Sequence, residues 1–143
     1  MKFVRYGDAG REKPGMLDAH GVLRDLSRVV DGIAGEALTK EGIGRLLALD
    51  PGALPAVAGT PRLGAPVGRG GKIICVGLNY ADHAAESGQP VPQQPVIFMK
   101  ATSAIVGAFD DVVIPPGSVK TDWEVELGVV IGDTARNVPR ETA

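Results

Sequence analysis

Three carboxylates lie at alternate positions near the end of the chain, at Asp122, Glu124 and Glu126. In a strand, side chains two residues apart point to the same face, so all three would share one side. No Lys or Arg is interleaved to offset their repulsion. Carboxylate oxygens are ligands that Mg²⁺ and Mn²⁺ prefer. The pattern has two interpretations, a metal-binding face or the solvated face of an exposed strand.

Glu124 and Glu126 are the better pair of candidate ligands. Carboxylates at i and i+2 of a strand can converge on one ion, whereas Asp122 lies too far along the strand and is interpreted as a neighbour. Two carboxylates leave most of an octahedral shell open. Waters or an oxygen-bearing substrate would have to fill it.

A second candidate constellation lies in the segment 79–86. His83 and Glu86 are three residues apart, so they share one face of a helix. A carboxylate beside an imidazole raises its basicity, which suits a general base, although the same spacing also describes an ordinary surface pair. Asn79 is expected to cap this helix, with Asp82 completing a capping box.

The first part of the chain is expected to form a small α+β unit. Residues 2–6 have the composition of a strand, and residues 15–26 that of a hairpin whose His20-Gly21 turn requires a positive φ. Residues 39–49 show helical spacing, with Thr39 as the N-cap and Asp50-Pro51-Gly52 as the stop. Residues 50–71 are rich in Pro, Gly and Ala, which indicates a domain boundary.

Strands are expected to dominate after residue 71, in an antiparallel or mixed sandwich. The acidic strand carries Trp123 and four aliphatic residues on its other face, which needs a covering layer. Few strands are available to build that layer, so we expect this chain to be the front part of a longer protein. The expected elements are strands at 72–76, 95–100, 104–106, 112–114 and 121–132, and helices at 80–86 and within 133–143.

Composition excludes several classes of function. The chain has 143 residues, 44% of them apolar, and a net charge of −2 with no basic run, so nothing indicates a nucleic-acid surface. No apolar stretch is long enough to span a membrane, and the N-terminus has no signal-peptide core. The single cysteine, Cys75, lies in an apolar run and is predicted to be a buried structural thiol. A cytoplasmic α+β protein is the expected class.

Four segments together resemble the fumarylacetoacetate hydrolase family. They are residues 72–86, 95–100, 103–107 and 122–132, which occur in the family's order. Residues 1–65 resemble, less closely, the small N-terminal domain of its bacterial two-domain members. The resemblance implies a small α+β domain at 1–65, followed at 66–143 by the first part of a catalytic domain built as a mixed β-sandwich roll. It also implies a homodimer.

The same resemblance implies roles for the candidate residues. Glu124 and Glu126, with a third Asp expected beyond residue 143, would bind Mg²⁺ or Mn²⁺. His83 with Glu86 would form the base that activates water. Lys100 corresponds to a recurrent family lysine, for which a substrate-binding or electrostatic role is expected. The substrate would be a small 2-oxo or 2,4-dioxo acid, with no nucleic acid or membrane as partner.

Other activities remain open at this point. The Arg5-Tyr6-Gly7 opening and the Lys120-Thr121-Asp122-Trp123 segment also resemble ureidoglycolate lyases of the family. An isomerase or decarboxylase would need almost the same metal ligands. A truncated, non-catalytic binding module is the alternative from a different class. The 143-residue portion alone is expected to be inactive.

Overall fold

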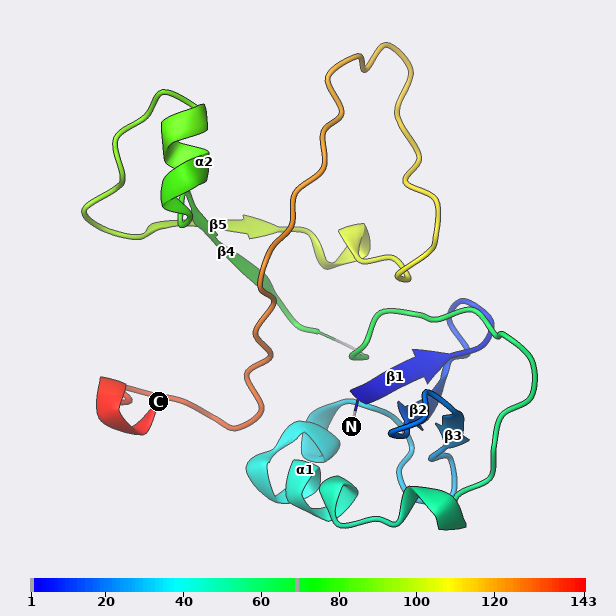
Figure 1. Cartoon of the computed structure of the whole chain (residues 1–143). Helices are drawn as coiled ribbons and strands as arrows, with labels where there is room; N and C mark the ends of the chain where they lie inside the picture. The colour runs from blue at the N-terminus through cyan, green and yellow to red at the C-terminus, as the bar shows by residue number, and fades with distance from the viewer. Residues whose placement is uncertain (1, 69) are drawn as a thin grey trace. The chain divides into compact units, whose positions relative to one another are not determined.

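The computed structural model describes residues 2–68 and 70–143. They form two compact units, the first comprising Met1–Gly68 with Gly107–Ala143 and the second Arg69–Val106. Short helices and small antiparallel sheets make up both (Figure 1). The α+β class predicted from the sequence is confirmed. The proposed domain boundary at residues 65–66 stays a prediction.

The first unit contains a three-stranded antiparallel sheet in the order β1-β2-β3. Its strands are β1 (Lys2–Tyr6), β2 (Lys13–Leu17) and β3 (Leu23–Asp25). The β2–β3 turn is held by Asp18, whose Oδ1 accepts hydrogen bonds from the backbone N–H groups of His20 and Val22, each at 2.9 Å. Gly21 has a φ of +77°, as the predicted turn requires.

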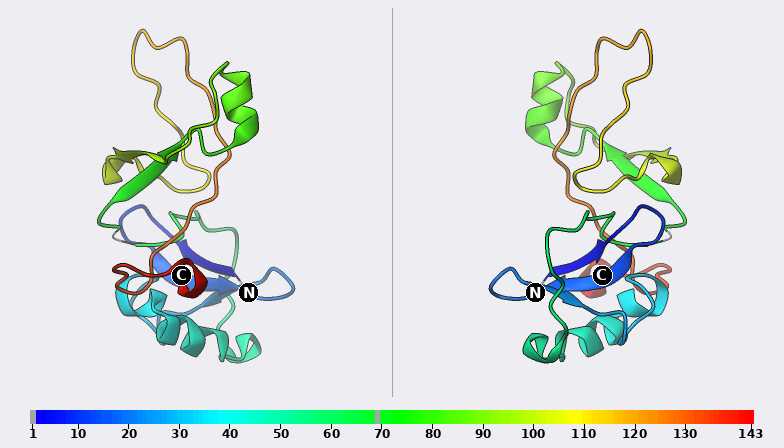
Figure 2. Two further views of the ribbon diagram at one scale, coloured as in Figure 1. Left: turned by 90° about the vertical axis from the view of Figure 1, so that its left-hand side faces the viewer. Right: turned by 90° about the vertical axis from the view of Figure 1, so that its right-hand side faces the viewer.

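One helix and two 3₁₀ turns follow the sheet. These are η1 (Gly35–Leu38), α1 (Lys40–Leu47) and η2 (Pro51–Ala53), and both views in Figure 2 show α1 alongside the sheet. Thr39 caps α1, because its hydroxyl accepts a hydrogen bond from the Gly42 N–H at 3.0 Å. The predicted cap is therefore confirmed, and the helix ends shortly before the Asp50-Pro51-Gly52 stop.

The core of the first unit lies between the sheet and α1. Its buried side chains come from β2, α1 and the segments between β3 and α1, so strand and helix are held together by apolar packing. They are Met16, Leu26, Ile33, Ala37 and Leu46, with Phe3, Val30, Leu38, Leu49, Leu54 and Val67 packed around them.

The second unit is a two-stranded antiparallel sheet with one short helix. Strand β4 (Ile73–Gly77) pairs with β5 (Val96–Lys100), and α2 (Ala81–Glu86) lies between them in the chain. The turn η3 (Thr102–Ala104) follows β5. Cys75 faces Phe98 across the sheet and is half-buried, so the prediction that its thiol is buried is wrong. Two strands alone offer too little cover to enclose it.

Several predicted elements after η3 are not formed. Residues 105–139, all of them described, contain no helix or strand, so the strands predicted at 104–106, 112–114 and 121–132 are wrong. A strand exists only if a neighbour completes its backbone ladder, and the described residues supply no neighbour here. The helix expected within 133–143 is reduced to the turn η4 (Arg140–Thr142), directly after Pro139.

Candidate functional site

The acidic segment, residues 111–131, belongs to the first unit and is exposed throughout. Asp122, Glu124 and Glu126 all face solvent, and Trp123 between them is 80% exposed. The Trp123 N–H donates to Oδ1 of Asp122 at 2.8 Å, a local contact. Because no β-ladder holds the backbone, the shared face on which the metal interpretation was based is not fixed by secondary structure. The assignment of Glu124 and Glu126 as ligands stays a prediction.

A complete metal site is not assembled in the described parts of the chain. Within residues 2–68 and 70–143, no group of three or more His, Cys, Asp or Glu side chains is placed to hold an ion. The donor chemistry nevertheless fits, because two closely spaced carboxylates offer the hard oxygens that Mg²⁺ or Mn²⁺ takes. Glu124 and Glu126 therefore qualify as part of a site that needs further ligands.

The short helix α2 in the second unit carries the candidate base. His83 and Glu86 are both exposed, and Ala84 on the same helix is buried. In the described structure no hydrogen bond or ion pair joins the two side chains. The exposed placement leaves both groups accessible to a substrate. Their role as a catalytic pair stays a prediction.

The predicted capping of α2 is wrong. Tyr80, rather than Asn79, occupies the N-cap position, and no side chain caps the helix there. Asp82 makes a local contact instead, its Oδ1 accepting from the adjacent His83 N–H at 2.9 Å. A helix of six residues without a side-chain cap gains little stability from its own backbone. The conformation of α2 therefore depends on what packs against it.

The connection from β4 to α2 contains a strained residue. Leu78 has a φ of +50°, in the left-handed region that large side chains rarely adopt. Such a conformation costs roughly 1–2 kcal/mol. Strain of this kind is often found beside functional sites, and here it lies two residues before Tyr80, the N-cap of the helix that bears His83.

Lys100 is the last residue of β5. It pairs with Ile73 across the sheet, and its side chain is exposed at the end of the strand. His83, Glu86 and Lys100 thus lie in the second unit, whereas Glu124 and Glu126 lie in the first.

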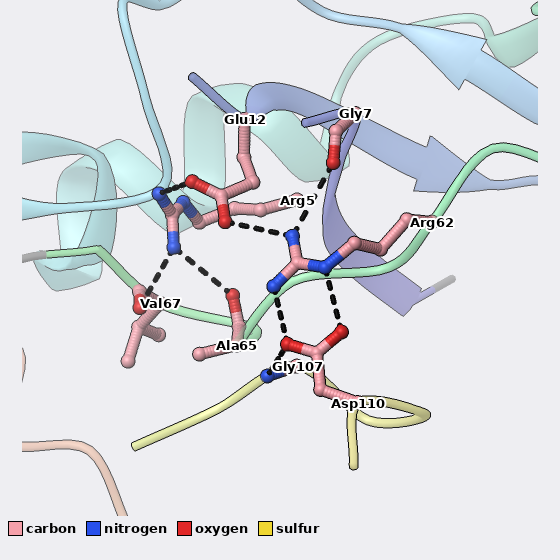
Figure 3. Close-up of polar contacts among 8 residues, drawn as sticks. All are labelled: Arg5, Gly7, Glu12, Arg62, Ala65, Val67, Gly107 and Asp110. Carbon is pink, nitrogen blue, oxygen red and sulfur yellow. Dashed lines mark hydrogen bonds and ion pairs between the residues drawn. The ribbon is translucent and has the colours of Figure 1, made fainter. Parts of the chain in front are cut away.

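A charged network that sequence reasoning missed links distant parts of the first unit (Figure 3). Arg62 donates two hydrogen bonds to Asp110, from Nε at 2.6 Å and from a terminal nitrogen at 2.5 Å. The same guanidinium pairs with Glu12 at 2.9 Å, and Arg5 pairs with the other oxygen of Glu12, also at 2.9 Å. Two arginines and two carboxylates therefore alternate along one chain of contacts.

These contacts shift the acidity of the groups involved. The hydrogen bond from Arg62 lowers the pKa of Asp110, and a second bond from the Gly107 N–H adds to the effect. Arg62 likewise lowers the pKa of Glu12. Both carboxylates remain ionised at neutral pH, so the network is fully charged. No local pattern signals it, because Arg62 and Asp110 are 48 positions apart.

Both candidate constellations fall within one match to a known protein family. A family model described as the C-terminal part of fumarylacetoacetate (FAA) hydrolase matches residues 72–143, which is half of the chain. The chain belongs to the fumarylacetoacetate hydrolase family. The matched region contains all five site candidates: His83, Glu86, Lys100, Glu124 and Glu126.

Individual relatives agree with this assignment. Proteins from Burkholderia ambifaria and Burkholderia multivorans, both provisionally named as hydrolases, are 61% and 60% identical to this chain over all 143 residues. The solved fumarylacetoacetate hydrolase from the psychrophile Exiguobacterium antarcticum is 32% identical, with a TM-score of 0.55 over 74% of this chain and 37% of its own. The α+β structure thus matches part of a fumarylacetoacetate hydrolase fold.

The chain spans about half the length of the curated relatives that it matches, 51% in both Burkholderia proteins. These relatives therefore have roughly as much chain again outside the matched region. Among the described residues, no helix combines the length and apolar character needed to cross a membrane.

Proposed function

We propose that this chain forms part of a divalent-metal-dependent hydrolase that cleaves an acylpyruvate-like 2-oxo or 2,4-dioxo acid. One observation carries the proposal. The family match over residues 72–143 includes both the α2 pair and the acidic segment, the two places where residue types alone indicated chemistry. Relatives that are provisionally named as hydrolases at about 60% identity support the same reaction class.

In this proposal Glu124 and Glu126 provide two carboxylates for Mg²⁺ or Mn²⁺. A third Asp would come from sequence that corresponds to the remaining length of the relatives. When bound, such an ion polarises a carbonyl group and stabilises enolate charge. Both glutamates are exposed and closely spaced in the chain, so a hydrated ion can reach them.

The proton chemistry is assigned to α2. An imidazole nitrogen of His83 takes a proton from water as the water oxygen attacks the C4 keto carbon of the 2,4-dioxo acid, while the Glu86 carboxylate supports the resulting positive charge. The bond from that carbon to the neighbouring methylene then breaks, and its electron pair passes to an enolate. The proton held by His83 then passes to the enolate carbon, which leaves a carboxylic acid and a pyruvate-like acid. The Lys100 ammonium would hold the substrate carboxylate.

We also propose that the enzyme is a cytoplasmic homodimer. The large apolar side chains of residues 123–131 are more than half exposed in the chain. Their exposure supports a subunit interface that would cover them. Light scattering coupled to gel filtration measures the assembly directly. A strictly monomeric enzyme at micromolar concentration would contradict this part of the proposal.

The test uses this chain alone and a chimera. In the chimera, the chain replaces the 143 matching residues of the Burkholderia ambifaria relative, whose remaining half is retained. Both proteins are screened with 2,4-dioxo acids and ureidoglycolate in the presence of Mg²⁺ or Mn²⁺. The chimera is expected to turn over a 2,4-dioxo acid, and the isolated chain is expected to be inactive.

Variants of the chimera test the assigned ligands. Glu124→Gln with Glu126→Gln should abolish metal-dependent turnover, whereas Glu141→Gln, an exposed carboxylate near the end of the chain, should leave it unchanged. Full Mg²⁺-dependent activity in the double variant would refute the ligand assignment. Turnover of ureidoglycolate alone would replace the proposed hydrolase with a lyase that uses the same residues.

A further inference from the structure

One end of the segment that contains the acidic residues is fastened by Asp110. Both of its carboxylate oxygens accept from Arg62, and Oδ2 also accepts from the Gly107 N–H at 2.7 Å. Gly107 approaches the Leu63 carbonyl oxygen so closely that a Cβ there would lie 2.5 Å from it. The backbone at 107–110 therefore packs closely against Arg62 and Leu63, which follow η2 in the first unit.

The Arg62 guanidinium is also held by partners other than Asp110. It donates to the Gly7 carbonyl at 3.3 Å and pairs with Glu12, whose side chain is only 8% exposed (Figure 3). Arg5 fixes Glu12 from the other side and donates to the Ala65 carbonyl. A guanidinium with this many fixed partners loses little additional freedom when it binds Asp110. The bidentate pair is thus stronger than an isolated surface ion pair.

The other end of the segment is fastened at the start of α1. Oδ2 of Asp133 accepts a hydrogen bond from the Lys40 N–H at 3.0 Å, across 93 positions of sequence. A carboxylate at this place satisfies a free helix N–H and interacts favourably with the positive helix end. Next to it, Gly132 approaches the Leu38 carbonyl oxygen so closely that a Cβ on Gly132 would clash with that atom.

The Arg62–Asp110 and Lys40–Asp133 contacts flank residues 111–131, which contain no helix or strand. Both contacts lie within the first unit, on the body formed by β1–β3 and α1. Glu124 and Glu126 occur inside this segment. In the absence of a β-ladder, contacts made by its ends limit how far the segment can move.

We propose that Asp110 and Asp133 are positioning residues for the acidic segment. Asp110 acts through its ion pair with Arg62, and Asp133 acts through its hydrogen bond to the N-terminus of α1. They hold its two ends on the N-terminal body and so restrict where Glu124 and Glu126 lie. The inference rests on the proposed function only in assigning those two glutamates as ligands. It gives the N-terminal part of the chain a role in the site, although the family match begins at residue 72.

The test measures the motion of the segment without metal. Trp123 is the only tryptophan in the chain, so its time-resolved fluorescence anisotropy reports on the segment directly. In the 143-residue chain, Asp110→Asn and Asp133→Asn should each increase fast depolarisation of Trp123, and the double variant more than either. Charge-assisted contacts of this kind predict a roughly 10- to 100-fold faster hydrogen exchange of the Gly107 and Lys40 amides that they protect.

Controls separate positioning from general destabilisation. Arg45→Gln removes the exposed Arg45–Glu41 pair on α1 and should change neither readout. Exchange of the β1–β3 amides should stay within about twofold in the Asp110 and Asp133 variants, because Arg62 keeps its bond to Glu12. Asp110→Glu, which retains the charge, should restore most of the slow anisotropy. Unchanged Trp123 motion in the double variant would overturn the inference.

A second arm keeps this inference distinct from the proposed function. In the chimera, which supplies the remaining part of the site, Mn²⁺ bound by Glu124 and Glu126 would quench the adjacent Trp123, and Glu124→Gln with Glu126→Gln should remove that quenching. Loss of restraint in the Asp110 and Asp133 variants without any such quenching would refute the ligand assignment and leave the positioning role supported. Quenching with no change in restraint would do the reverse.

Discussion

Replacing Leu46 by Ala should destabilise the first unit by about 3 kcal/mol. Leu46 is 1% exposed and lies in the core with Met16, Leu26 and Ile33. The substitution removes three carbons, worth about 0.8 kcal/mol each in transfer free energy. A residual cavity adds to this cost, and comparable substitutions fall between roughly 2.7 and 5 kcal/mol. The loss is a large share of the stability of so small a body.

Leu47→Ala is the matched control. Leu47 is next to Leu46 on α1 but is 52% exposed, so the same chemical change should cost about 1 kcal/mol or less. The small gain in helix propensity from Leu to Ala is the same at both positions and cancels in the comparison.

Urea unfolding followed by far-ultraviolet circular dichroism measures both variants. With a slope of about 1–3 kcal/mol per molar, Leu46→Ala should lower the midpoint by about 1–3 M, whereas Leu47→Ala should shift it far less. Hydrogen exchange of the β1–β3 amides should show the same order. Equal shifts for the two variants would refute the assignment of Leu46 to the core and of Leu47 to the surface of α1.

Three further predictions concern acidity, capping and catalysis. Arg62 lowers the pKa of Glu12 and of Asp110 below their ordinary values of 4.5 and 3.8. The stability that these carboxylates confer should therefore be present above those values and be lost as the pH falls through the lowered pKa values. Urea midpoints measured from pH 6 to pH 3 should show this loss, and the midpoint should depend less steeply on pH in Arg62→Gln. Thr39→Ala should cost about 1 kcal/mol and Thr39→Ser much less, since only the former removes the hydroxyl that caps α1, and equal urea midpoints would contradict the cap. In the chimera, His83→Ala should lower kcat by roughly 10²–10⁴-fold without changing Mn²⁺ affinity, and a variant at full speed would return His83 to the class of surface residues.

Local patterns predicted the elements that local forces build. The β2–β3 hairpin follows from its turn residues, and α1 follows from a spaced apolar face with Thr39 as its cap. These signals lie within a few residues of one another. They need no knowledge of distant partners.

The wrong strand predictions and the missed ion pair share one physical cause, which is dependence on distant partners. A strand at 121–132 requires a neighbouring backbone, and alternation of side chains does not reveal whether one is present. The Arg62–Asp110 pair was missed because charged residues are common on surfaces and nothing marks two that are 48 positions apart as a pair. The candidate ligands could be named from residue types, but not their placement.

The long sequence separation between the partners in the Arg62–Asp110 and Lys40–Asp133 contacts also has a consequence for folding during synthesis. Lys40 leaves the ribosome 93 residues before Asp133, about 5–20 s earlier at ordinary elongation rates. Small domains often fold within a second. The body formed by the β1–β3 sheet and α1 can therefore be complete while residues 111–131 are still being translated. The nascent acidic segment then emerges beside a folded body that already carries the contact sites for both of its ends.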